Sequence, residues 1–158
     1  MKAAKKCSEY VTSAVFSPDG MYITSVSDGS NPKIWDTTTE ECKAELIGHL
    51  AMVSSAVFSP DGMHIVSASK DHTAQIWNIA IEQDEAEVEG HSDSVTSAVF
   101  SSDGMHVVSL SDDCTPKIWS IAAGKCETEL IGHSEYVNSA IFSPDGMHIV
   151  SASNDYTA

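Results

Sequence analysis

Residues 55–63 have the sequence Ser-Ala-Val-Phe-Ser-Pro-Asp-Gly-Met, and nearly the same nine residues begin at Ser13, Ser97 and Ser139. The copies are 42 residues apart, so the 158-residue chain holds about 3.8 repeats and ends within the fourth. A fixed period near 40 residues is typical of repeat proteins, whose units are too small to hold separate cores and therefore stack. A stacked array of this kind predicts a surface that binds a partner rather than a catalytic centre.

One repeat contains four short stretches that are typical of β-strands. Between Gly48 and Gly90, strands are predicted at residues 53–58, 63–69, 73–77 and 84–88. Residues 59–62, Ser-Pro-Asp-Gly, predict a tight turn, because Pro presets φ to about −65° and Gly supplies a positive φ. No stretch shows helical periodicity over a useful length. The sequence therefore predicts an all-β fold built from four-stranded antiparallel units.

Three short motifs recur at fixed offsets within this pattern. Gly-His occurs at 48–49, 90–91 and 132–133, a Ser-x-Ser-x-Asp segment follows, and Ile-Trp occurs at 34–35, 76–77 and 118–119. The pattern resembles the WD-repeat β-propeller family over essentially the whole chain, although only Trp35 is followed by a literal Asp. The resemblance implies a propeller with an incomplete ring. Its blades would span about 8–47, 50–89 and 92–131, with a partial fourth blade at about 134–158.

The resemblance also implies a hydrogen-bonded tetrad of His, Ser, Asp and Trp inside each blade. Carried over by position, the tetrad residues are His49, Ser67, Asp71 and Trp77; His91, Ser109, Asp113 and Trp119; and His133, Ser151 and Asp155. In the first blade Cys7 and Gly29 occupy the His and Asp positions, which leaves Ser25 and Trp35 and predicts a looser blade.

A Ser, His and Asp set also suggests a catalytic triad. A triad needs one reactive set that faces a pocket beside an oxyanion site, whereas this set recurs in successive units, as a structural bracket would. His64, His106 and His148 recur as well, but equivalent positions on neighbouring blades lie too far apart to share one metal ion. We therefore predict a protein that is not an enzyme and that has no cofactor and no metal.

The resemblance further implies a partner-binding rim around the narrow end of the channel. Its contacts come from the segment after Gly-His and from the residue before the tetrad Asp. Two tyrosines with carboxylates nearby would suit a peptide that carries Lys or Arg, and an ordinary solvated rim is the alternative. The candidate positions are Tyr10, Met52, Ser94, Tyr136, Thr12, Ser54, Thr96, Asn138, Asp28, Lys70, Asp112 and Asn154.

Composition excludes several other classes of partner. The chain has 23 acidic residues, 8 lysines and no arginine. A nucleic-acid binder needs a basic face, and phosphopeptide recognition normally relies on arginine, so neither partner is expected. No apolar stretch approaches the ~20 residues that span a membrane. Four cysteines without a Cys-x-x-Cys pair, and a start that lacks a signal sequence, predict a cytoplasmic or nuclear protein.

The fourth repeat stops before its Trp strand and its outer strand. An open array exposes strand edges and apolar blade faces, which favours association. Either the chain is a fragment of a longer array, or it assembles with copies of itself. Two chains would supply about eight blades, within the range of 4–8 for propellers, so a homodimer is favoured. The sequence thus predicts an interaction scaffold, with a purely structural module that binds only its own copies as the alternative.

Overall fold

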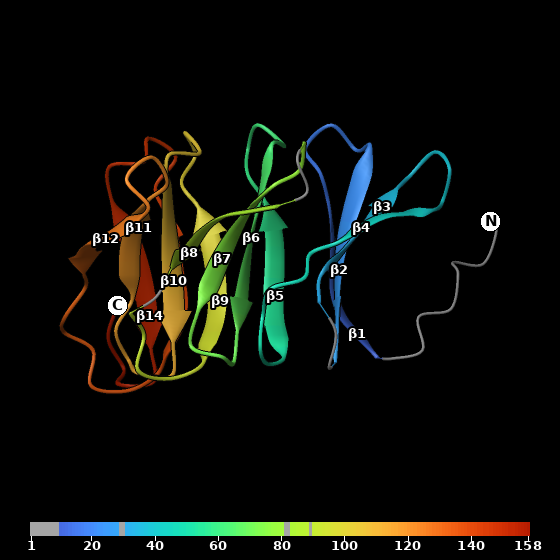
Figure 1. Cartoon of the computed structure of the whole chain (residues 1–158). Coiled ribbons are helices and arrows are strands. Elements are labelled where there is room, and N and C mark those ends of the chain that lie inside the picture. The colour runs from blue at the N-terminus through green and yellow to red at the C-terminus, as the bar shows by residue number, and fades with distance from the viewer. Residues whose placement is uncertain (1–9, 29–30, 81–82, 89) are drawn as a thin grey trace.

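The described part of the chain consists of β-strands and turns. The structure is a computed structural model, and it describes residues 10–28, 31–80, 83–88 and 90–158. Within these residues it contains no helix, and its strands form four separate antiparallel sheets. The sheets stand side by side in chain order and do not close into a ring (Figure 1). The predicted all-β fold, an incomplete propeller, is confirmed.

Each of the first three sheets contains four strands in chain order, and the fourth contains two. The first sheet holds β1 (Val11–Phe16), β2 (Tyr22–Ser27), β3 (Lys33–Asp36) and β4 (Cys42–Glu45). The second holds β5 (Val53–Phe58), β6 (His64–Ser69), β7 (Ala74–Asn78) and β8 (Gln83–Val88). The third holds β9 (Val95–Phe100), β10 (His106–Ser111), β11 (Lys117–Ser120) and β12 (Lys125–Glu129), and the fourth holds β13 (Val137–Phe142) and β14 (Ile149–Ser153).

The Ser-Pro-Asp-Gly turn, which is Ser-Ser-Asp-Gly in the third sheet, fixes the first hairpin of each sheet. In the second sheet Ser59 accepts a hydrogen bond from the Gly62 N–H at 2.9 Å, and Gly62 has φ 72°. Asp61 accepts hydrogen bonds from the Ser59 hydroxyl and the Met63 N–H, which hold the pKa of its carboxyl below the usual value. The same contacts occur at the other three copies, so the register of every first hairpin is set by local chemistry.

The core lies between neighbouring sheets rather than within one sheet. Ile34 and Leu46 of the first sheet pack against Ile65 and Trp77 of the second, and all four are at most 1% exposed. A second cluster joins the second and third sheets around Trp119, and a smaller one joins the third and fourth sheets. Each sheet therefore depends on its neighbour for burial. Cys7 and Gly29, on which the prediction of a looser first blade rests, lie outside the described residues.

Candidate functional site

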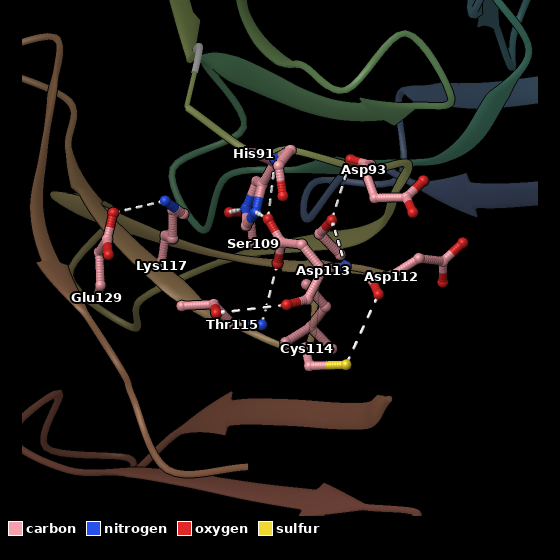
Figure 2. A network of polar contacts seen from close by, with 12 residues as sticks. His91, Asp93, Ser109, Asp112, Asp113, Cys114, Thr115, Lys117 and Glu129 are labelled. Carbon is pink, nitrogen blue, oxygen red and sulfur yellow. Dashed lines mark hydrogen bonds and ion pairs between the residues drawn. The ribbon is translucent and has the colours of Figure 1, made fainter. Parts of the chain in front are cut away.

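The third sheet brings its predicted tetrad residues into one hydrogen-bonded chain. His91 Nδ1 lies 2.8 Å from Asp113 Oδ2, and His91 Nε2 lies 2.6 Å from Ser109 Oγ, as Figure 2 shows. The indole Nε1–H of Trp119 donates to Ser109 Oγ at 2.8 Å. His91 comes from the loop before β9, Ser109 from β10, Asp113 from the turn after β10 and Trp119 from β11. The tetrad therefore connects the hairpin of β10 and β11 to the loop that leads into β9.

The protonation of this tetrad follows from its surroundings. Burial lowers the pKa of His91, whose side chain is 0% exposed. Burial alone would raise the pKa of Asp113, but hydrogen bonds from His91 and from two backbone N–H groups outweigh that effect and lower it. A neutral imidazole therefore donates a hydrogen bond from Nδ1 to the ionised Asp113 carboxylate and accepts one from the Ser109 hydroxyl at Nε2. Every donor within the tetrad has an acceptor, which favours a rigid structural network.

The other sheets repeat this geometry to different extents. In the second sheet the His49–Asp71, His49–Ser67 and Trp77–Ser67 distances are 2.8, 2.7 and 2.8 Å. In the fourth sheet His133 lies 2.9 Å from Asp155 and 2.8 Å from Ser151, and in the first sheet Trp35 donates to Ser25 at 2.8 Å. Burial raises the pKa of Asp71, but hydrogen bonds from Thr73, Leu50 and His49 bring it down to about 2.

A threonine that the sequence patterns did not single out joins this network. Thr73 donates its hydroxyl to Asp71 at 2.7 Å, and Thr157 donates to Asp155 at 2.6 Å. In the third sheet the Thr115 backbone N–H donates to Asp113 at 3.0 Å (Figure 2). The available signal was the recurrence of Thr two residues after each tetrad Asp, at the same 42-residue period.

The geometry of the inner tetrads gives substrate no access to the serine. Ser67 and Ser109 are 0% exposed, and each hydroxyl lies between a histidine and an indole. Across the described ranges, no group of three or more His, Cys, Asp or Glu is arranged to hold a metal ion. Nor does the described chain include a helix of the length and apolarity needed to cross a membrane.

The predicted rim residues meet in pairs at one end of the sheets. The first residue of each pair directly precedes the first strand of a sheet, and the second directly follows the second strand of the same sheet. The N–H of the second residue donates to the carbonyl of the first in every sheet: Asp28 to Tyr10 at 2.9 Å, Lys70 to Met52 at 2.9 Å, Asp112 to Ser94 at 3.0 Å and Asn154 to Tyr136 at 3.0 Å.

The remaining rim candidates are the extra residues of β-bulges. The register between the first two strands shifts at these positions in all four sheets, and bulges of this kind redirect side chains; the residues are Thr12, Ser54, Thr96 and Asn138. Thr12 and Thr96 donate to backbone carbonyls at 3.2 and 3.3 Å. Asn138 donates to Asn154 at 2.7 Å. Thr12, Thr96 and Asn138 are therefore engaged within the chain, and the tyrosines and charged residues are the rim groups best placed for a partner.

Two further carboxylates extend the rim. Asp93 and Glu135 directly precede Ser94 and Tyr136, and both are exposed. Burial raises the pKa of the Cys114 thiol, and the carboxylates of Glu135 and Asp112 raise it further, which indicates that acidic groups of the third and fourth sheets gather there. We define the acidic rim as Tyr10, Asp28, Asp93, Asp112, Glu135 and Tyr136.

Comparison with known proteins agrees with this geometry. The family model described as "WD domain, G-beta repeat" matches residues 3–36, 40–78, 83–120 and 124–158. A comparison with curated proteins gives no match. Repeats of this family generally form protein-interaction scaffolds without catalytic activity, and the matches support that general role here. Because the four matches cover most of its length, the chain belongs to the WD40 repeat family.

Proposed function

We propose that the chain is a non-catalytic scaffold that presents its acidic rim to a basic peptide. The observation that carries this proposal is the presence of two exposed tyrosines and four carboxylates at one end of the sheets. Tyr10 is 87% exposed and Tyr136 is 50% exposed, although each anchors a backbone hydrogen bond at the rim. Exposed aromatic side chains of this kind are frequent anchors in protein interfaces.

Charge determines which peptide suits this rim. Lys70 is the single cation among the twelve predicted rim positions, whereas Asp28 and Asp112 belong to that set and Asp93 and Glu135 adjoin it. Carboxylates on several sheets raise the local concentration of a cationic partner and accelerate its association. A tyrosine face can also hold a Lys or Arg side chain through a cation–π contact.

The free Cys42, Cys114 and Cys126 support a reducing, cytoplasmic location.

The test uses a lysine-rich peptide and its glutamate-substituted counterpart as probes. Replacement of both tyrosines, Tyr10→Ala with Tyr136→Ala, should weaken binding of the lysine-rich peptide at least ~10-fold in fluorescence anisotropy. Glu135→Lys should weaken it by a smaller factor, and added salt should reduce that difference. Glu41→Lys is the matched control, because it changes net charge equally from an exposed position away from the rim.

Two outcomes would contradict the rim proposal. Equal binding of the acidic and basic probes would exclude recognition by charge. If the tyrosine double variant and Glu135→Lys leave binding unchanged while circular dichroism shows a folded chain, the rim is an ordinary solvated surface. The peptide would then bind elsewhere on the chain, and the acidic rim would have no part in its recognition.

We also propose that the scaffold acts after self-association into a closed ring, with a dimer as the favoured form. On the first sheet Val11 is 49% exposed and Phe16 is 67% exposed. On the fourth sheet Ile141 and Val150 are 55% and 56% exposed. Corresponding positions between inner sheets are covered by the adjoining blade, so the two end faces are complementary to each other.

The mass in solution across a concentration series tests this assembly. Phe16→Glu and Val150→Glu should each convert a light-scattering dimer to monomer, because each places a charge in the apolar contact. An equimolar mixture of the two variants should recover part of the dimer, since one face of each chain remains intact. Met63→Glu, at an exposed turn of the second sheet, should leave the mass unchanged. A monomer at all concentrations of the unmodified chain would exclude the closed ring.

A further inference from the structure

Four exposed methionines lie at the end of the sheets opposite the acidic rim. The rim residues precede the first strand of a sheet or follow the second, whereas these methionines follow the turn that joins the two strands. The exposed fractions are 48%, 63%, 56% and 80% for Met21, Met63, Met105 and Met147, which we call the methionine row. Each sheet therefore presents one large apolar side chain to solvent at this end.

The turns that carry the methionine row contact one another. A Cβ added at Gly62 would lie 3.5 Å from the proline ring of the first-sheet turn, and one at Gly104 would lie 3.7 Å from that of the second-sheet turn. Ser102 of the third sheet donates its hydroxyl to the Pro144 carbonyl of the fourth at 2.9 Å. The turns thus form one continuous surface. Contiguous apolar patches on a protein surface are a common mark of an interaction site.

The backbone beneath the methionine row is fixed, although the side chains are free to adapt. The Met63 N–H donates to Asp61 Oδ1 at 2.9 Å, and the Met63 carbonyl accepts from the Ile79 N–H at 3.0 Å. Corresponding bonds hold Met21 and Met105. Unbranched thioether side chains on such a base adjust to irregular apolar partners. Because these backbone groups are engaged, a partner must bind this surface through side chains rather than as an added strand.

An apolar hollow adjoins the methionine row. Its volume is about 350 Å³, and its walls come from the first strands and the turns of the first three sheets. They include Phe58 and Pro60, which belong to the same hairpin as Met63, and Phe100 of the third sheet. A hollow of this kind can take one bulky apolar side chain as the anchor of a partner.

Carboxylates lie beside each methionine of the row. Hydrogen bonds from the turn serine and from the methionine N–H lower the pKa of every turn aspartate, which keeps these side chains ionised at neutral pH. In the second sheet both bonds use Oδ1 of Asp61, so a cation can bind Oδ2 without breaking the turn. An apolar row with anionic neighbours is complementary to an apolar stripe with cationic neighbours. The exposed turn aspartates are Asp19, Asp61, Asp103 and Asp145.

We propose that the methionine row binds a basic amphipathic helix of a partner protein. The apolar stripe of the helix packs on the methionines, and its largest apolar side chain enters the hollow. Its Lys and Arg side chains pair with the turn aspartates. A helix suits this surface because its own backbone groups bond to one another, so it binds through side chains alone. The site lies at the opposite end of the sheets from the acidic rim and does not depend on the proposed function.

A synthetic peptide of leucine, lysine and alanine is the probe, about 18 residues long, with leucine at helical spacing. A scrambled peptide of the same composition has the same charge but no apolar stripe. The amphipathic peptide should gain helical circular dichroism as it binds, and it should bind at least ~10-fold more tightly than the scrambled one. A version with glutamate in place of lysine should bind more weakly than either, because the turn aspartates repel it.

Nuclear magnetic resonance of methionines labelled with carbon-13 at the methyl group locates the bound helix. The chain has six methionines, and Met52 lies on the rim at the other end of the sheets. The amphipathic peptide should shift the methyl signals of the methionine row and leave that of Met52 in place. This measurement needs no variant of the chain, so it does not depend on how a substitution affects folding.

Variants test the contribution of each group. Met63→Gln with Met105→Gln should weaken binding about 10-fold, because glutamine keeps the length of the side chain but is polar. Leu50→Gln with Met52→Gln makes two changes of the same kind at the rim end, and it is the matched control, with affinity within about 2-fold of the unmodified chain. Asp61→Asn keeps the Oδ1 acceptor and should weaken binding about 3-fold, with a smaller loss at high salt.

Three results would overturn the proposal. The first is equal affinity for the amphipathic and scrambled peptides, which would mean that charge alone drives binding. The second is a shift of the Met52 signal without a shift in the methionine row. The third is loss of helix binding in the rim variant Tyr10→Ala with Tyr136→Ala, which would assign the helix to the acidic rim. If that variant loses the lysine-rich peptide but keeps the helix, the two sites are separate, as proposed.

Discussion

The six residues His-Ile-Val-Ser-Ala-Ser occur twice, at 64–69 in the second sheet and at 148–153 in the fourth. Both copies pair with the preceding strand in the same register. Yet Val66 is 0% exposed whereas Val150 is 56% exposed. The comparison shows that the repeat itself determines the hairpin, and that the adjoining sheets determine how deeply the hairpin is buried.

The largest expected effect separates these two valines. Val66→Asp places an unpaired charge in the core and should lower the free energy of unfolding by about 4 kcal/mol or more. Val150→Asp should change it by less than about 0.5 kcal/mol, because that side chain already meets solvent. Urea denaturation followed by circular dichroism, at concentrations where the chain is monomeric, measures both values. Equal losses would mean that the fourth sheet is covered in solution.

A smaller difference is expected for the tetrad serines. Ser67→Ala leaves the Trp77 indole N–H and the Nε2 atom of His49 without a partner in the core, and each such group costs about 1–3 kcal/mol. Ser151→Ala affects His133 alone, so its cost should be about half as large. Denaturation curves of the two variants give the ratio. A ratio near one would indicate that the indole bond contributes nothing measurable to the stability of an inner sheet.

The sequence predicted those features that local chemistry determines. The predicted strands at 53–58, 63–69, 73–77 and 84–88 agree within one residue at each end with β5, β6, β7 and β8. The Ser59–Gly62 turn was predictable because its hydrogen bonds join residues that are close along the chain. The family was predictable from the constant spacing of Gly-His and Ile-Trp, which preserves the relation between strands across repeats.

Other features depend on contacts between residues distant in sequence. Asn138 and Asn154 bond to each other, so neither amide is fully available at the rim, and the one-dimensional pattern gives no sign of this. Besides burial, the Glu135 carboxylate, next to the fourth sheet, raises the pKa of the Cys114 thiol, next to the third. The repeat period alone does not reveal this influence between sheets. The role of Thr73 was visible as a recurrence, but its meaning required the 2.7 Å contact with Asp71.

Acid should weaken the inner tetrads in two steps. Burial lowers the pKa of His91 from 6.5 in the folded state, so the unfolded chain takes up this proton first and stability falls as the pH drops below about 6.5. The pKa of Asp71 is about 2 when folded against 3.8 when unfolded, so its contribution is lost between about pH 4 and pH 2. Urea titrations at a series of pH values should resolve both steps.

Variants assign each step to its residue. His91→Gln should remove the step near pH 6.5 and leave the lower one. Asp71→Asn should be less stable than the unmodified chain at pH 7, and the difference should shrink as the pH falls towards 2. A difference that stays constant across this range would mean that the Asp71 carboxylate contributes equally in folded and unfolded chains.

The smallest expected effect concerns the turns that follow β6 and β14. His72 and Tyr156 have φ of 73° and 67°, a conformation that costs a side chain about 1–2 kcal/mol. His72→Gly and Tyr156→Gly should each raise the free energy of unfolding by up to about 1 kcal/mol, after the greater chain entropy of glycine is subtracted. The controls Lys70→Gly and Asn154→Gly, at positions outside the positive-φ set, should lower it instead. Equal gains at His72 and Tyr156 would show that the backbone conformation belongs to the repeat, since one sheet is enclosed by neighbours and the other stands at the end. Unequal gains would mean that a neighbouring sheet also holds the turn in place. The backbone conformation of the turn would then depend on the adjoining sheets, as the burial of the hairpin does.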